Sequence, residues 1–311
     1  MAYAQIIEPN DTGAGTGRIL DPVLIAALSH YSDGQGALRL IAHAGCICGT
    51  GVLVWLALPS WYLLIPAMAV HGVTLVTLFA PMHECVHRTA FASRGANLAV
   101  GWVAGLVSVY NSTFYRHFHA WHHRYTQDPE RDPELIFPKA TSRLDYFKEI
   151  SGFNFWLRRA IDYPPLALGQ TRDLAFVPPA ARREIALSMS AQLLVYLAGA
   201  LSIGLGYGAV LYFWFLPLLI AQPALRSLLV LEHTGCSLDR NGLTNTRTTL
   251  TSLPIRLLMW NMPFHAEHHL YPTVPFHQLP ALHHYVRGRL RHVAPGYIAG
   301  NLELVTSLPR G

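Results

Sequence analysis

Five consecutive residues, His83-Glu84-Cys85-Val86-His87, read HECVH. Two histidines four residues apart lie on one face of a helix, where they can bind one metal ion. With a glutamate after the first histidine, the pattern is also that of zinc metallopeptidases, in which the glutamate is the general base. Whether this chain is a membrane zinc peptidase therefore depends on what other metal ligands it offers.

Further histidines recur in a five-residue pattern, HxxHH. The pattern occurs in RHFHAWHHRYT and again in WNMPFHAEHHLYP, and one more histidine stands in LEHTG. The spacing i, i+3, i+4 predicts that each trio shares a helical face. We interpret nine histidines as metal ligands: His83, His87, His119, His122, His123, His233, His265, His268 and His269. Isolated histidines, such as His43, His71 and His283, are expected to be hydrogen-bonded core or surface residues.

Nine imidazoles are more than one metal ion needs. A catalytic zinc takes three protein ligands and a water, and a 2-His-1-carboxylate iron site takes three. Soluble di-iron proteins use Glu-x-x-His on two helices, and this chain matches that pattern once, at Glu84 and His87. Nine ligands suit two metal ions, each with four or five nitrogens and an open position. Imidazole suits iron, copper, zinc and nickel, so the ligand count leaves the metal open.

Acidic residues adjoin these histidines in the sequence. A carboxylate that accepts a hydrogen bond from the second ring nitrogen of a ligand histidine fixes the orientation and tautomer of that ring. We predict this supporting role for five residues: Glu84, Asp128, Asp132, Glu232 and Glu267. For Asp128, Asp132 and the nearby Glu134, the alternative is a solvated acidic loop.

The composition indicates a membrane protein. Of 311 residues, 51% are hydrophobic and 13% are charged, whereas soluble chains carry about 25% charged residues. Residues 40–82 and 185–225 contain no Asp, Glu, Lys or Arg. Because a membrane-spanning helix needs roughly 20 apolar residues, each stretch predicts two spans with a short turn between them. The expected spans are about 40–58, 61–82, 187–204 and 209–229.

The positive charges predict the orientation. All 23 Lys and Arg lie outside the two uncharged stretches, so neither turn carries one. The positive-inside rule then puts both termini, the middle segment and the nine histidines in the cytoplasm. The net charge of +5 fits that face, and we expect no nucleic-acid partner. We expect no cleaved signal peptide, since no basic stretch followed by an apolar run opens the sequence.

The predicted fold is an all-α integral membrane protein. Four transmembrane helices form two hairpins, with interfacial helices and a cytoplasmic histidine-rich cap. Residues 97–111 are expected to form an interfacial or re-entrant helix, with a fifth span as the alternative, and 153–168 another interfacial helix. We expect a polar N-terminal lead at 1–36, a single membrane domain at 37–295 and a C-terminal tail at 296–311.

The three clusters, in this order and with His233 before the last, resemble the histidine boxes of the membrane-bound fatty acid desaturase and hydroxylase superfamily over about residues 38–290. The resemblance implies a non-haem di-iron centre, with Fe2+/Fe3+ and dioxygen as co-substrate, that attacks an unactivated C–H bond. Desaturation is the expected outcome, and hydroxylation by a monooxygenase using the same site is the alternative. HECVH would then not be a peptidase motif.

Two segments, RYTQDPERDPE and the one around WNMPFHAEHHLYP, are similar to a bacterial branch of that superfamily. The branch includes hydrocarbon-oxygenase-like proteins linked to rhizopine catabolism and desaturases of small amino-acid-like metabolites. The likeness implies a lipid-like or small amphipathic substrate and a place in the bacterial inner membrane. No HPGG-type haem motif is present, so a separate donor such as a ferredoxin or rubredoxin, with its reductase, is expected to supply electrons. A transporter or metal store would need ionisable residues deep in the spans, where the sequence has little beyond His43 and His71.

Overall fold

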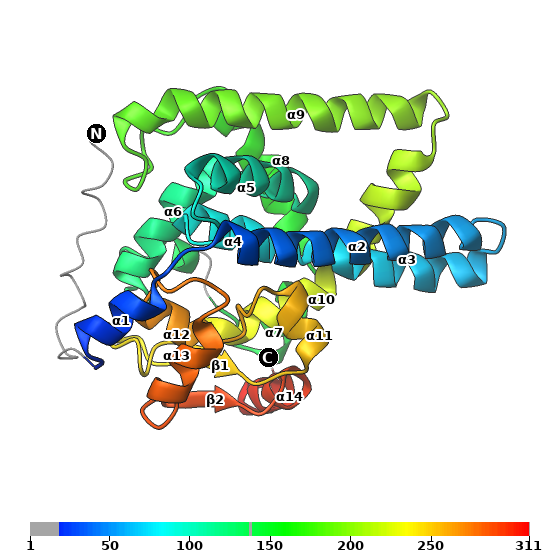
Figure 1. The fold of residues 1–311 in the computed structure, drawn as a ribbon. Helices are drawn as coiled ribbons and strands as arrows, with labels where there is room; N and C mark the ends of the chain where they lie inside the picture. Colours follow the sequence, from blue (N-terminus) through cyan, green and yellow to red (C-terminus); the bar gives the residue numbers. More distant parts are fainter. Residues whose placement is uncertain (1–18, 137–138, 311) are drawn as a thin grey trace.

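The computed structural model describes residues 19–136 and 139–310, and the described chain is mostly helical (Figure 1). Among the described residues, four helical stretches are long and apolar enough to cross a membrane: Asp33–Ala57, Trp61–His87, Pro179–Gly204 and Leu211–His233. They match the four expected spans. At the ends away from the turns they extend several residues further, toward the histidines.

The first pair of long helices lies side by side. Helix α2 (Asp33–Ala57) and α3 (Trp61–Val76) pack together and are joined by residues 58–60. A bend then leads into α4 (Phe79–His87). Pro81 has no backbone N–H to donate to the residue four positions earlier, and that residue is Thr77, the C-cap of α3. Helix α4 carries the HECVH residues.

The two helices of the second pair pack on different neighbours. Helix α9 (Arg182–Gly204) packs along α8 (Phe153–Ala167), while α10 (Leu216–His233) packs along α3. Near the turn, the ring of Trp214, in the π-helical segment Leu211–Phe215, lies 5.7 Å from that of Tyr196. Helix α10 approaches α3 closely at Gly72, where a Cβ atom would lie 2.1 Å from the Pro217 carbonyl oxygen. The two expected hairpins therefore differ in structure.

Shorter helices fill the space between these pairs. Helix α5 (Arg94–Ser108) packs on α4 and α6 (Ser112–Tyr125). It has 15 residues, which is about 22 Å of helix against a hydrocarbon core of about 30 Å. That length argues against a fifth span. Helix α7 (Arg143–Ile150) follows the 3-10 turn Pro133–Ile136, and a second such turn, Pro179–Ala181, precedes α9.

The C-terminal third of the chain covers the histidine side. Strand β1 (Arg247–Thr249) pairs in parallel with β2 (His292–Ala294). The helices here are α11 (Leu253–Leu258), α12 (His265–Leu270), α13 (Leu279–Val286) and α14 (Tyr297–Ser307). Helix α14 packs on α10 and α7, so residues 296–307 of the expected tail are part of the packed structure.

Only half of the expected N-terminal lead is described. Residues 1–18 lie outside the described residues, while 19–36 form α1 (Pro22–Leu28) and the start of α2. Leu28 joins a hydrophobic cluster with Leu279 and Leu282 of α13. The first described helix, α1, thus packs on the C-terminal third of the chain, which also contributes α12.

Candidate metal centre

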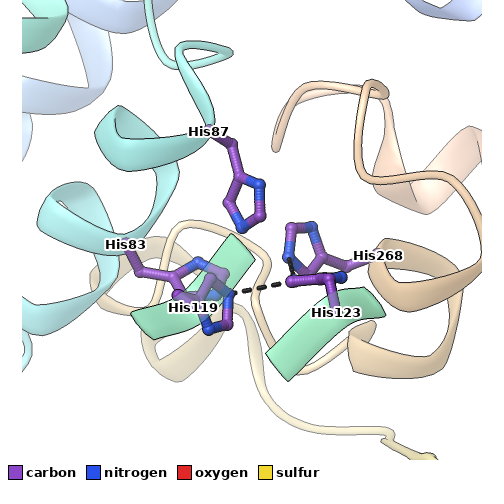
Figure 2. A group of neighbouring side chains, drawn as sticks. All are labelled: His83, His87, His119, His123 and His268. Atoms are coloured by element: carbon purple, nitrogen blue, oxygen red, sulfur yellow. Dashed lines mark hydrogen bonds between the residues drawn. The ribbon is translucent and has the colours of Figure 1, made fainter. Parts of the chain in front are cut away.

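Five histidines from three helices converge on one point (Figure 2). Their ligand atoms all lie within 4.8 Å of one another. The Nε2 atom of His123 is 3.0 Å from that of His119 and 3.1 Å from that of His268. This first histidine group consists of His83 and His87 from α4, His119 and His123 from α6, and His268 from α12.

The other four predicted ligands form a second histidine group next to the first: His122, His233, His265 and His269. The Nε2 atom of His265 lies 3.2 Å from that of His233 and 3.1 Å from that of His269. The two groups touch where the rings of His123 and His269 stack with centroids 4.1 Å apart. The nine histidines singled out in the sequence are thus brought together.

The nitrogen positions fit metal ions. Two imidazole nitrogens bound at right angles to one ion, about 2.1 Å from it, lie about 3 Å apart, which is the spacing found in both groups. Within the described part of the chain, several buried ring nitrogens also have no hydrogen-bond partner, including both of His83, Nε2 of His87 and Nε2 of His122. Buried polar atoms are rarely left unpartnered, and a metal ion would satisfy one such nitrogen of each histidine.

Comparison with known proteins fits this geometry. The family model described as Fatty acid desaturase matches residues 38–301. The chain belongs to the fatty acid desaturase family. The sn-1 oleoyl-lipid 12-desaturase of a Picosynechococcus species is 26% identical over 263 residues, which cover 78% of this chain and 73% of the relative. The dihydrorhizobitoxine desaturase of Bradyrhizobium elkanii is 27% identical over 281 residues, covering 82% and 73%.

These findings confirm the family that the three histidine boxes indicated. The protein is an oxidoreductase of the desaturase type, and with its four long apolar helices it is an integral membrane protein. Its histidine groups are of a kind that can hold metal ions, and iron is the metal that its family generally uses.

Burial keeps five of the ligand histidines of α6 and α12 in this desaturase-family protein neutral. The pKa of His119, His123 and His268 is held well below 6.5, first by burial and then by neighbouring imidazoles. Burial acts in the same way on the pKa of His265 and His269. Only a neutral imidazole has a lone pair for a metal, so these side chains are ready to bind at neutral pH.

Carboxylates adjoin the second histidine group. His122 Nδ1 lies 2.9 Å from Asp132 Oδ1 and 3.7 Å from Glu134 Oε2. Burial alone would lower the pKa of His122, but the charges of Glu134 and Asp132 raise it. The other predicted carboxylate here, Glu232, has Oε2 3.5 Å from His265 Nε2. For Glu134 the sequence left two alternatives open, a solvated acidic loop and support of His122, and the structure places it beside His122.

Three of the predicted supporting carboxylates have other partners. Glu84 accepts a hydrogen bond of 2.6 Å from the Thr89 hydroxyl and one of 3.0 Å from the Phe276 backbone N–H. Glu267 bonds the Thr248 hydroxyl and His283 Nδ1. Asp128 pairs with Arg240 at 3.2 Å. Glu84 differs from expectation because one residue along a helix turns the side chain by about 100°, away from the face that His83 presents to the first group.

The isolated histidines lie outside both groups. His43 Nε2 lies 2.9 Å from the Thr74 carbonyl oxygen, and His71 Nε2 lies 3.0 Å from that of Phe213. His283 is the partner of Glu267. All three have the hydrogen-bonded packing roles expected of single histidines.

Proposed function

We propose that this desaturase-family enzyme binds one iron ion in each histidine group and uses dioxygen to oxidise an unactivated C–H bond, with desaturation as the outcome. The observation that carries the proposal is the convergence of nine imidazoles in two adjacent groups, with nitrogens 3.0–3.2 Å apart. The named relatives act on an oleoyl lipid and on dihydrorhizobitoxine. We therefore propose an alkyl substrate that is lipid-like or small and amphipathic.

In this proposal, the residues of the chain orient the metal ligands and keep water away from them. Bound iron would couple the reduction of dioxygen to oxidation of the substrate. Asp132 accepts the Nδ1–H of His122, which fixes the tautomer that leaves Nε2 free. Glu232 is placed differently, because its Oε2 atom lies 3.5 Å from His265 Nε2, the nitrogen that also faces His233 and His269. Burial keeps His119, His123 and His268 neutral at physiological pH, so each has a lone pair available to a metal ion.

An aromatic border closes the first histidine group on its apolar side. The ring of Phe79 lies 5.8 Å from that of His83 and 4.7 Å from that of Tyr110. Tyr115 stacks on His119 with centroids 5.0 Å apart. We propose that these rings exclude water from the first group and contact the alkyl part of the substrate, since they offer apolar surface next to the ligand nitrogens.

The zinc peptidase interpretation fits the geometry poorly. A peptidase of the HExxH type needs its glutamate beside the metal-bound water. Here Glu84 accepts its hydrogen bonds from Thr89 and Phe276. His83 and His87 also share their site with three further histidines, which exceeds the three-ligand set of a catalytic zinc.

The distribution of charged residues and the fold suggest how the protein is oriented in its membrane. We propose that the histidine groups and both ends of the chain face the cytoplasm at the bacterial inner membrane. The positive residues outside the spans support this orientation. We propose a separate ferredoxin- or rubredoxin-like donor, with its reductase, as the source of electrons.

Metal content tests the proposal directly. We would purify the full chain without oxygen, determine its metals by elemental analysis and record Mössbauer spectra. About two irons per chain, reduced by His122→Ala or His268→Ala, is the expected result. One zinc per chain that is indifferent to His268→Ala would overturn the proposal and favour the peptidase.

A further inference from the structure

A cavity of about 800 Å³ lies on the far side of α4 from the histidine groups. Helices α4, α5, α6 and α9 line it. Its apolar wall includes Leu98, Trp102, Val103 and Leu187, and hydroxyls of Ser112, Thr113 and Ser188 line another part. Cys85 lies in the wall, about 200° around α4 from His83 at 100° per residue. Its lining residues in the described part of the chain include none of the nine histidines and none of Phe79, Tyr110 and Tyr115, which separates it from the proposed substrate site.

Two arginines line the same cavity. Arg116 pairs with Glu184 at 3.3 Å. Within the described residues, the Arg88 guanidinium has no hydrogen-bond or ion-pair partner. Positive charges on Arg116 and Arg94 act on Arg88, and Glu184 is the anion that opposes them. The three arginines outnumber the one glutamate, so this region carries excess positive charge, which an anionic group would balance.

The cavity lies where a membrane surface is expected. Arg182 and Arg183 begin α9, and its uncharged stretch starts at Ile185. Glu184, Leu187 and Ser188, which line the cavity, lie at this transition. Positively charged side chains at the end of a span are placed at lipid headgroups. On the apolar side, Leu187 is 61% exposed and Val103 is 54% exposed, so the wall is open to lipid tails.

We propose that this cavity binds one phospholipid with an anionic headgroup. The phosphate would accept hydrogen bonds from Arg88 and Arg116, as charge-assisted bonds to arginine favour. One acyl chain would lie along Leu98, Val103 and Leu187. Net negative charge in the headgroup is required, because a zwitterionic headgroup leaves the excess positive charge unbalanced.

The bound lipid would link two helices that carry ligand histidines. Arg88 directly follows His87 of α4, and Arg116 lies one turn before His119 on α6. A phosphate held by both arginines replaces their mutual repulsion by attraction to a shared anion. We therefore expect the lipid to stabilise the protein, whatever reaction the histidine groups perform.

Lipid binding to the full chain tests this inference. Native mass spectrometry and thermal unfolding would be measured with phosphatidylglycerol, with phosphatidylcholine and with inorganic phosphate. One phosphatidylglycerol per chain and a raised Tm are expected, without either effect from the other two. Arg88→Gln and Arg116→Gln should each weaken binding roughly tenfold or more, since each removes a charged donor. The matched control is Arg183→Gln, next to Glu184 but outside the cavity wall, which should bind as the wild type does.

A second variant covers the case in which Arg88→Gln does not fold. Leu98→Trp keeps every charge and fills the apolar part of the cavity, because Leu98 lines it on α5. It should lose phosphatidylglycerol as well. Equal binding of phosphatidylcholine, full stabilisation by inorganic phosphate, or unchanged phosphatidylglycerol binding in Arg116→Gln and Leu98→Trp would each overturn the inference.

Discussion

The two histidine groups are built from the same side chain but have different surroundings. The first group, with five imidazoles, is bordered by aromatic rings such as Phe79 and Tyr115. Asp132, Glu134 and Glu232 instead adjoin the second group. The second site thus has three carboxyl groups beside it, and one of them, Glu134, also comes within 4.8 Å of a ring nitrogen of His119 in the first site. Ions in two such sites would differ in electron density, since hydrogen bonding to a carboxylate makes a ligand imidazole more basic.

Each HxxHH box serves both groups. In α6, His119 and His123 join the first group and His122 joins the second. In α12 the division is reversed, because His265 and His269 join the second group and His268 joins the first. Residues i and i+4 lie about 40° apart on a helix, whereas i+3 and i+4 lie about 100° apart. Two adjacent histidines therefore point into two different sites.

The largest expected effect comes from replacing two adjacent ligand histidines one at a time. His268→Ala and His269→Ala change adjacent residues, one in each group. Each should lower activity by more than about a hundredfold, since loss of a ligand exceeds the 10–100-fold cost of losing an outer partner. Mössbauer spectra should show that the two variants lose different iron signals. His284→Ala, outside both groups, is the matched control and should keep both. Loss of the same signal in both variants would refute the division into two groups.

A moderate effect is expected at the negatively charged side. Asp132→Asn keeps the shape of the side chain but removes the charge beside His122 Nδ1. Iron affinity of the second group should fall by about 10–100-fold while the first group is retained. Iron titration followed by Mössbauer spectroscopy measures both. Asp128→Asn, in the same loop but paired with Arg240, should bind iron normally. Equal weakening of both groups would show that Asp132 supports the fold rather than His122.

The pH dependence of stability should follow the neutral imidazoles. The folded-state pKa of His119, His123 and His268 lies below 6.5. Below pH 6.5 the unfolded chain takes up protons that the folded chain does not, so metal-free protein should lose stability as the pH falls through 6.5 and downward. Each unit of pKa difference corresponds to about 1.4 kcal/mol per histidine.

Thermal unfolding of metal-free protein between pH 5 and 8 measures this dependence. His122 has the opposite sign, because its folded-state pKa is raised. Its contribution is fully present below pH 6.5 and is lost as the pH rises through its folded-state value. His268→Ala removes one of the histidines whose pKa is lowered, so it should reduce the loss of stability at acid pH. Stability that rises on acidification would contradict the neutral state of the first group.

The sequence predicted which residues gather but not how they divide. Spacing identified eight of the nine histidines, and His233 was chosen for its place just past the fourth span. The four long helices were predicted from the length of the uncharged runs. The division of each box depends on how α6 and α12 are rotated relative to α4 and α10, which is set by packing between distant segments. The same holds for Glu84 and Glu267, whose partners Phe276 and His283 lie in other parts of the chain.

The smallest effect is expected at Glu84, a carboxylate that adjoins neither group. Its Oε1 atom accepts from Thr89 and from the Phe276 N–H, and a glutamine oxygen can accept both bonds. Glu84→Gln should therefore keep two irons and most of the activity, and the free energy of unfolding should fall by about 1 kcal/mol. Elemental analysis, activity and thermal unfolding check the three expectations. The peptidase and oxidase hypotheses predict opposite results at Glu84. A peptidase that loses its general base loses its activity. The oxidase proposed here would lose only a structural contact.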